Sequence, residues 1–341
     1  MSFRILSIDG GGIREIVAAR MLQAIEQQLN QPLRDYFDLI TGTSTGAIIA
    51  AGLMIGRSAA QLVDLYLNKG QIIFPYRSWF NLQRLGLIVK YGLSAPKFAD
   101  DGLIRVIQSE IGLDKLLADV SPDPHEATKL MITSYDTVRR LPIIFKSWRH
   151  EEWYASVPLW ETCVCSASAP TYFPAHLLVA NHQGNVAKFS MIDGGVGANN
   201  PVACAVAEAI RLLRSGTVPG ERAETSLDRI VDEISVLSVG TGELGRSLPW
   251  QEVRGWGAID WAPRIVDVIM DAPADIHRYI AEQIVTTAGT EQTQCYLRLQ
   301  PELNQKFGAI DNASLNYLNQ LLYETDAYLA TQRKPIESFF S

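Results

Sequence analysis

Three glycine-rich turns carry the side chains of this sequence that could perform chemistry. They span residues 9–14, 42–46 and 193–195, and each follows a short apolar run that predicts a buried strand. In an open α/β sheet, ligands gather at the carboxyl ends of the strands. We therefore expect the three turns to converge on one site.

The second turn reads Gly-Thr-Ser-Thr-Gly and places Ser44 between a predicted strand and a predicted buried helix. A serine on such a sharp turn projects its hydroxyl outward, and the small residues Gly42 and Gly46 let the backbone make the turn. The following helix would direct the positive end of its dipole at the site. This context favours a nucleophilic serine over the alternative, a glycine-flanked serine that caps the helix.

The first turn contains three consecutive glycines, Gly10, Gly11 and Gly12, at a predicted helix start. Backbone N–H groups exposed there can bind an anion. A dinucleotide fingerprint would need glycine where the chain has Glu15, and the Gly-Lys-Ser/Thr of a phosphate loop is missing. We therefore expect the three amides to form an oxyanion hole. Arg14 either orients this loop or lies on the surface.

The third turn ends a predicted buried strand with the carboxylate of Asp193. A plain turn before a helix begun by Pro201 would explain the neighbouring glycines and asparagines, but explains less well a carboxylate in that place. Of the five histidines only His277 follows Asp193, on a predicted polar helix without a glycine turn nearby. Asp193 is therefore the candidate base for the Ser44 hydroxyl, in place of the histidine of a conventional triad.

These motifs, in this order, resemble those of the patatin-like phospholipase family. Further matches, which extend the resemblance over about residues 5–242, lie at 166–170, 172–173, 199–201 and 238–242. The resemblance implies a dyad of Ser44 and Asp193, acyl transfer through a covalent acyl-enzyme, and no metal or other cofactor. Glu15 departs from the family, which usually has glycine after the loop arginine, and this departure bears on the backbone path into the first helix.

Apolar runs of strand and helix spacing alternate along the chain and predict a three-layer α/β/α fold with a mainly parallel central sheet. The strands are expected at 3–8, 36–41, 130–135, 143–146, 189–192 and 234–239. The helices are expected at 13–29, 47–56, 59–69, 101–117 and 201–213, and a surface loop at 214–228.

We expect a single patatin-like domain over residues 1–341, with a motif-bearing core at about 5–242 and a mostly helical C-terminal part at about 250–341. Three tryptophans near the start of that part, Trp250, Trp256 and Trp261, are expected to pack in the core. A wall of an acyl pocket and a dimer contact are the alternatives for them.

The composition narrows the partners and the compartment. A formal net charge of −7 argues against a general binder of nucleic-acid polymers. The spacing of the four cysteines predicts free thiols in a reducing cytosol rather than a zinc site. The N-terminus lacks the apolar stretch of a signal peptide, and no run reaches the ~18 apolar residues of a spanning helix. We expect a soluble cytoplasmic protein that can dock on the inner face of the membrane.

Residues 74–98 combine aromatic and aliphatic side chains with four basic residues and no acidic residue. The basic residues are Arg77, Arg84, Lys90 and Lys97. Such a composition suits transient peripheral contact with an anionic bilayer. A subunit interface, and hence a homodimer, or a helical hairpin packed on the core are equally open alternatives.

Together these features predict a lipid acyl-hydrolase of the phospholipase A or lysophospholipase type, acting on phospholipids or lysolipids. One alternative is a membrane-degrading effector that a cyclic nucleotide activates in antiviral defence, because bacterial patatin-like proteins of similar length and motif order include such effectors. A second alternative is a non-catalytic lipid-binding relative. The intact Ser44, glycine loop and Asp193 argue against that second alternative.

Overall fold

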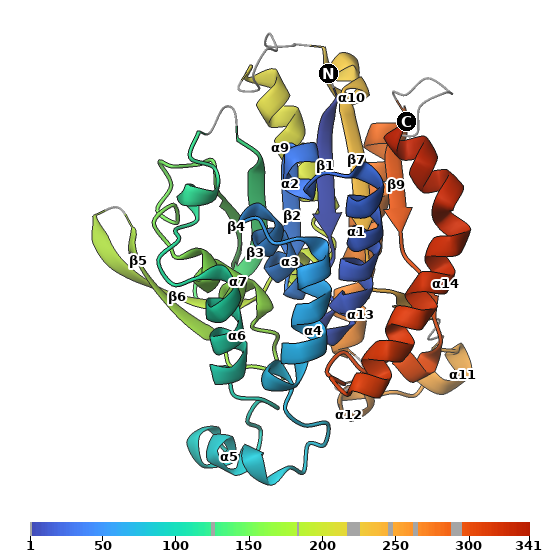
Figure 1. Ribbon diagram of the computed structural model, residues 1–341. Helices are drawn as coiled ribbons and strands as arrows, with labels where there is room; N and C mark the ends of the chain where they lie inside the picture. The colour runs from blue at the N-terminus through green and yellow to red at the C-terminus, as the bar shows by residue number, and fades with distance from the viewer. Residues whose placement is uncertain are drawn as a thin grey trace.

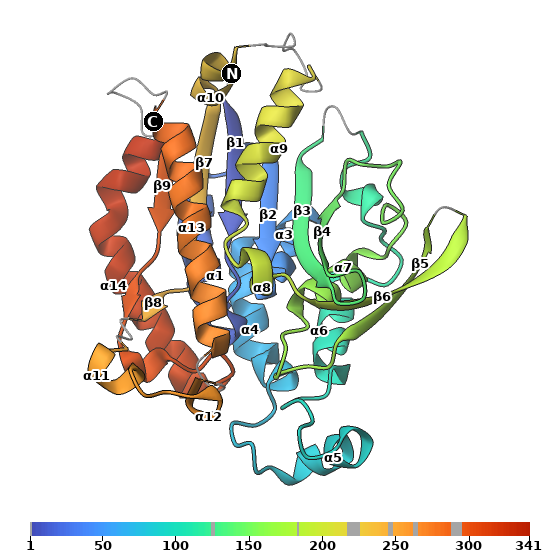
Figure 2. The ribbon, with the colours of Figure 1, turned by 180° about the vertical axis from the view of Figure 1, so that it is seen from behind.

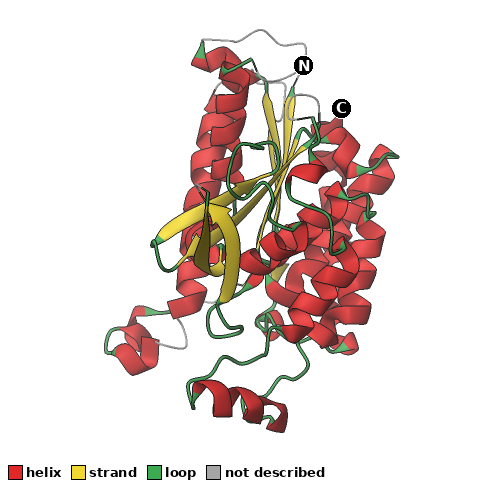
Figure 3. Cartoon of the chain, turned by 90° about the vertical axis from the view of Figure 1, so that its left-hand side faces the viewer, coloured by secondary structure: helices red, strands yellow, loops and turns green. Residues whose placement is uncertain are grey.

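The computed structural model describes residues 2–123, 127–182, 184–216, 226–244, 248–261, 265–287 and 295–341. A central sheet lies between two layers of helices, as Figures 1 and 2 show from opposite sides and Figure 3 shows from the side. The predicted three-layer α/β/α fold with a mainly parallel central sheet is therefore confirmed.

The main sheet has the strand order β5-β6-β3-β2-β1-β7-β9, with β4 paired to β3. Its five neighbouring strands from β3 to β9 are parallel, whereas β4, β5 and β6 pair antiparallel. The strands are β1 (Phe3–Ile8), β2 (Leu39–Thr43), β3 (Lys129–Asp136), β4 (Leu141–Lys146), β5 (His176–His182), β6 (Asn185–Asp193), β7 (Ile234–Val239) and β9 (Tyr296–Leu299). A separate short pair joins β8 (Glu243–Leu244) and β10 (Glu302–Leu303).

Helices cover both faces of the sheet and bury its central strands, which explains why those strands appear in the sequence as continuous apolar runs. The longer helices are α1 (Glu15–Leu29), α3 (Thr45–Met54), α4 (Ala59–Ile73), α6 (Asp101–Ile111), α7 (Leu159–Ala167), α9 (Val202–Arg214), α13 (Ile265–Thr287) and α14 (Leu315–Phe340). In Figure 1, α1, α4 and α14 lie in front of the sheet, and Figure 2 shows α9 and α13 on its other face.

Short helices occupy several of the connections. They are η1 (Gly12–Arg14), α2 (Leu33–Tyr36), η2 (Leu82–Arg84), α5 (Leu85–Tyr91), η3 (Ala118–Val120), α8 (Gly195–Ala198), α10 (Leu227–Asp232), α11 (Trp250–Val253), α12 (Ala258–Trp261) and η4 (Gln305–Phe307). Residues 217–225 of the predicted loop at 214–228, like His125, lie outside the described residues. No described helix combines the length and apolarity needed to cross a bilayer.

Some predicted boundaries were wrong for local reasons. The strand expected from residue 36 begins at Leu39, because the preceding residues form α2. The helix expected to reach residue 117 ends at Ile111, because Gly112 adopts a φ of +89° that ends the helix. Core packing was wrong for Trp250, which is 66% exposed. Trp256 and Trp261 are half-buried and pack edge to face at 5.1 Å.

The C-terminal part contains an edge strand that helical periodicity did not indicate. Strand β9 pairs in parallel with β7 and thereby extends the sheet of the motif-bearing part. Helix α14 packs along α1, where Arg20 and Asp326 form an ion pair of 2.7 Å. The last 50 or so residues therefore contribute directly to the sheet and to one of its covering layers.

Candidate active site

Ser44 lies in the sharp turn between β2 and α3, with a φ of +56° and a ψ of −128°. This backbone conformation is unfavourable for a residue with a side chain and is stored strain of the kind found at functional sites. The turn is so tight that a Cβ on Gly42 would lie 2.3 Å from the Gly46 carbonyl oxygen. A Cβ on Gly46 would lie 2.3 Å from the Asp9 carbonyl oxygen. Both flanking glycines are thus required by close backbone contacts.

Strand β3 brings Ser44 and Asp193 together, because β2 and β6 meet along one of its edges. Thr43 at the end of β2 pairs with Thr133 of β3, and Asp193 at the end of β6 pairs with the next residue, Ser134. Strand β4 occupies the opposite edge. Since β2 runs parallel and β6 antiparallel to β3, their carboxyl ends approach each other head to head.

The Ser44 hydroxyl donates a hydrogen bond of 2.5 Å from its Oγ to Oδ2 of Asp193. The other carboxylate oxygen, Oδ1, accepts from the backbone amide of Gly195 at 2.7 Å. Asp193 is fully buried, and burial raises its pKa to about 7 although both hydrogen bonds favour the charged form. At neutral pH a carboxylate with this pKa can accept a proton far better than an ordinary aspartate.

The glycine loop lies beside this pair, but its three amides are not equivalent. The Gly10 amide donates to the Asn199 carbonyl at 3.0 Å, whereas the Gly11 amide makes a longer bond of 3.3 Å to Thr45 Oγ1. Gly12 has a φ of +60°, which favours glycine. The amides of Gly11 and Gly12 are therefore the ones that an anion at Ser44 could bind with the least loss of existing hydrogen bonds. The sequence pattern did not reveal this difference among the three amides.

Glu15 begins helix α1 directly after the short helix η1, so the departure from the family pattern leaves a continuous helical path. Its side chain is fully buried, and Oε2 accepts a hydrogen bond of 3.0 Å from Thr45 Oγ1. Burial raises the pKa of this carboxyl well above its usual range. Glu15 thus connects the first helix, through Thr45, to the Gly11 amide.

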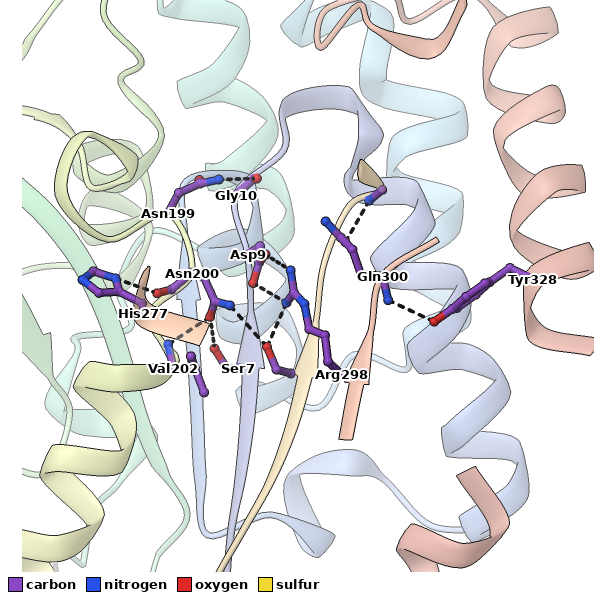
Figure 4. Close-up of polar contacts among 12 residues, drawn as sticks. Ser7, Asp9, Gly10, Asn199, Asn200, Val202, His277, Arg298, Gln300 and Tyr328 are labelled. Atoms are coloured by element: carbon purple, nitrogen blue, oxygen red, sulfur yellow. Dashed lines mark hydrogen bonds and ion pairs between the residues drawn. The ribbon is translucent and has the colours of Figure 1, made fainter. Parts of the chain in front are cut away.

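A buried ion pair fixes the start of the glycine loop from the C-terminal part of the chain. Arg298 of β9 donates to Asp9 through both Nη atoms, at 2.9 and 2.5 Å, and also to Ser238 Oγ at 2.8 Å. Figure 4 shows this fork beneath the loop, next to Asn200. Asn200 in turn accepts from Ser7 Oγ at 3.3 Å. Arg298 escaped sequence reasoning because it is a single residue on a four-residue strand without a motif.

The described histidines make contacts away from the nucleophile. His277 Nδ1 lies 3.1 Å from the Asn200 carbonyl oxygen and must donate there, because a carbonyl only accepts. His150 bonds the Ser121 carbonyl, and His176 bonds Glu161. Within the described part of the chain, then, no histidine is hydrogen-bonded to the Ser44 hydroxyl.

Ser44 lines a cavity of about 560 Å³. This volume is within the usual range for small-molecule sites. The polar lining of the cavity includes the glycine loop, Ser44, Asp193, Asn199 and Arg14. Most of the remaining wall is apolar and includes Phe74, Leu103, Tyr172, Phe173, Ile192, Ile269, Met270 and Ile310. The predicted nucleophile, base and oxyanion loop therefore line one cavity, whose largely apolar wall suits an apolar chain.

Comparison with known proteins adds independent information. The family model described as patatin-like phospholipase matches residues 6–206. Patatin-like protein 2 of Arabidopsis thaliana is 30% identical, over 97% of this chain and 83% of that protein. Probable inactive patatin-3-Kuras 1 of Solanum tuberosum is 28% identical, over 87% of this chain and 78% of that protein. Among solved structures, VipD from Legionella pneumophila covers 98% of this chain and 76% of its own, at 10% identity and a TM-score of 0.35.

The ion pair beneath the loop leads to a stability prediction. Replacing Arg298 with Met leaves Asp9 buried without its partner, which we expect to lower the free energy of unfolding by about 3–5 kcal/mol. The control is Arg20→Met, which removes the more exposed ion pair to Asp326 and should cost less than about 1 kcal/mol. Urea unfolding of both variants measures the difference. Equal losses in the two would show that the buried pair has no special structural role.

Proposed function

Since this chain belongs to the patatin-like phospholipase family, we propose that it is a serine esterase that cleaves fatty-acyl esters of phospholipids or lysolipids. One relative is named as probably inactive, so the family alone does not establish activity. The observation that carries the proposal is the 2.5 Å hydrogen bond from Ser44 Oγ to a fully buried carboxylate with a pKa of about 7.

In the acylation step, Asp193 Oδ2 takes the proton of the Ser44 hydroxyl while Oγ attacks the ester carbonyl carbon. The carbonyl electron pair moves onto its oxygen, next to the glycine loop. When the tetrahedral intermediate collapses, the C–O bond to the leaving alcohol breaks and the alcohol receives the proton from Asp193. An acyl-enzyme on Ser44 remains.

In the deacylation step, water enters in place of the alcohol and gives a proton to Asp193 as it attacks the acyl carbon. The second tetrahedral intermediate expels Ser44 Oγ, which recovers the proton from Asp193. The products are a free fatty acid and the deacylated lipid, and both catalytic side chains return to their starting state.

The amides of Gly11 and Gly12 supply the oxyanion hole in this scheme, because the Gly10 amide is bonded to the Asn199 carbonyl at 3.0 Å, whereas the bond from Gly11 to Thr45 is longer at 3.3 Å. Removal of one oxyanion donor typically costs about 2.7–4 kcal/mol of barrier. Arg14 lies on the same cavity wall and adds positive charge near the developing oxyanion. Helix α3, which begins at Thr45, directs its positive end at the same place.

The apolar wall favours a fatty-acyl chain as the group held in the cavity. A long chain buried there contributes about 0.8 kcal/mol for each methylene removed from water. We also propose a cytoplasmic location, because Cys163, Cys165 and Cys204 are free thiols and the first two of them are buried.

Replacing Ser44 with Ala tests the nucleophile. We expect hydrolysis of a phospholipid and of p-nitrophenyl butyrate to fall at least about 1,000-fold, and labelling by a fluorophosphonate probe to disappear. Ser109→Ala, near the C-terminal end of helix α6 and not part of the cavity lining, is the matched control and should behave as wild type. A loss of comparable size in His277→Ala, with its fold intact, would indicate a triad instead of the dyad.

The raised pKa of Asp193 predicts a specific pH dependence. Below about pH 7 the carboxyl is protonated and cannot accept the Ser44 proton, so kcat/KM for an uncharged ester should rise about tenfold per pH unit there. The rise should level off above about pH 8. Stopped assays from pH 5 to 9 give the profile. An inflection near pH 4 would mean that Asp193 is an ordinary aspartate and would contradict the proposed base.

Replacing Asp193 with Asn should abolish activity and yet stabilise the protein. Folding raises the pKa of this carboxyl from 3.8 to about 7, so its ionisation opposes folding increasingly as the pH rises through this window. The stability gain of Asp193→Asn over wild type should therefore be small at pH 4 and on the order of 2–4 kcal/mol at pH 8. Urea unfolding at both pH values measures it. A gain that is independent of pH would contradict the assignment.

A further inference from the structure

Residues 75–97 form a lobe that projects beyond the body of the protein at the carboxyl ends of the central strands, as Figures 1 and 2 show. This projecting lobe contains η2 and α5 and connects α4 to α6. Its two roots are Phe74, which lines the cavity, and Phe98. The two rings pack edge to face at 5.6 Å, and Phe98 also packs on the cavity residue Phe173 at 5.7 Å. The lobe thus begins and ends at the cavity wall.

Polar contacts hold the lobe together from within. The buried guanidinium of Arg84 donates to the carbonyl oxygens of Ala95 and, at 3.2 Å, Pro96, and lies 4.7 Å from the ring centre of Trp79. Lys97, also buried, forms an ion pair with Asp311 at the base of the lobe. These contacts give the lobe a defined conformation that does not depend on an apolar interior.

The lobe exposes large apolar side chains to solvent. Phe80 is 98% exposed and Val89 is 87% exposed. The others that are exposed in this segment are Trp79, Leu82, Leu85, Tyr91 and Leu93. A short segment that buries an arginine and exposes seven large apolar groups inverts the usual pattern and marks an interaction surface. The alternative of a hairpin packed on the core does not fit these exposures.

The exposed charge of the lobe is positive but smaller than the sequence indicated. Of the four basic residues in 74–98, Arg77 and Lys90 are exposed, whereas Arg84 and Lys97 are buried. The segment contains no acidic residue, so two cations stand among the exposed apolar groups. The protein as a whole has a net charge of −7, so this local excess of cations is opposite in sign to the overall charge.

We propose that the projecting lobe inserts its apolar side chains into an anionic lipid bilayer and so places the cavity mouth against the membrane. Apolar groups enter the acyl boundary while the cations meet lipid phosphates. A second copy of the chain fits the surface less well, because two lobes would bring like charges together. The inference rests on the proposed function, because a bilayer would supply the lipid esters that the proposed esterase cleaves.

Vesicle co-sedimentation tests the apolar part of this surface. In a Ser44→Ala background, which leaves the lipids intact, we expect binding to vesicles of phosphatidylcholine and phosphatidylglycerol. Phe80→Ser/Val89→Ser should weaken that binding at least about tenfold. The matched control is Val186→Ser/Tyr323→Ser, which changes residues that are 79% and 74% exposed on β6 and α14. This control should bind as the parent does.

The electrostatic part has its own matched pair. Arg77→Glu/Lys90→Glu should weaken binding about tenfold or more at 50 mM NaCl and much less at 500 mM. Lys115→Glu/Arg140→Glu makes the same change in net charge at exposed residues outside the lobe and should change binding little. With active Ser44, all four variants should keep wild-type hydrolysis of p-nitrophenyl butyrate, and the lobe variants alone should lose hydrolysis of vesicle lipids.

The outcomes separate this inference from the proposed function. Vesicle binding that depends on the lobe, in a protein without any esterase activity, would support the surface and contradict the proposed function. Esterase activity without vesicle binding would support the proposed function and contradict the membrane-binding surface. A dimer in analytical ultracentrifugation that Phe80→Ser/Val89→Ser dissociates would overturn the inference, because the lobe would then contact a second copy.

Discussion

The burial of one carboxylate against one hydroxyl is the interaction on which the rest of the site depends. Asp193 is fully buried, and within the described residues only the Ser44 hydroxyl and the Gly195 amide satisfy its oxygens. Burial without a cationic partner is unfavourable for the charged form, and this cost is what raises the pKa of Asp193 to about 7. Burial of the charged carboxylate therefore both lowers the stability of the folded protein and makes the carboxylate basic enough to accept the serine proton.

Backbone pairing in the sheet holds both residues in place despite the unfavourable burial of the Asp193 carboxylate. Asp193 and Ser44 end up adjacent because β6 and β2 end on consecutive residues of β3. Rigid strands rather than flexible loops thus set the distance between base and nucleophile. On the other side of Ser44, the glycine loop is held from below by the Arg298–Asp9 pair and from the side by Thr45 and Glu15. Each holding contact comes from a different part of the chain.

The cavity and the projecting lobe are joined at one residue and together bear on how a substrate would reach Ser44. Phe74 belongs to both, since it lines the cavity and forms one root of the lobe. The lobe therefore starts from a residue of the apolar wall that encloses Ser44. Two rigid polar contacts, Arg84 to backbone carbonyls and Lys97 to Asp311, free the apolar side chains of the lobe to face outward. Cations that look like surface charge in the sequence serve instead as internal supports.

The sequence by itself determined the features that contiguous residues encode. Turn chemistry is local, so Gly42, Ser44 and Gly46 predicted the elbow, and runs of apolar residues predicted the buried strands and the layered fold. Only the tertiary structure decided contacts between residues far apart, because no local pattern records them. Arg298 lies 289 positions from Asp9, and β9 around it is too short for periodicity to reveal. Likewise, burial alone separated Arg77 and Lys90, which face solvent, from Arg84 and Lys97. Hydrogen bonding alone separated the Gly10 amide, bonded to a backbone carbonyl at 3.0 Å, from the Gly11 amide, whose bond to Thr45 Oγ1 is longer at 3.3 Å.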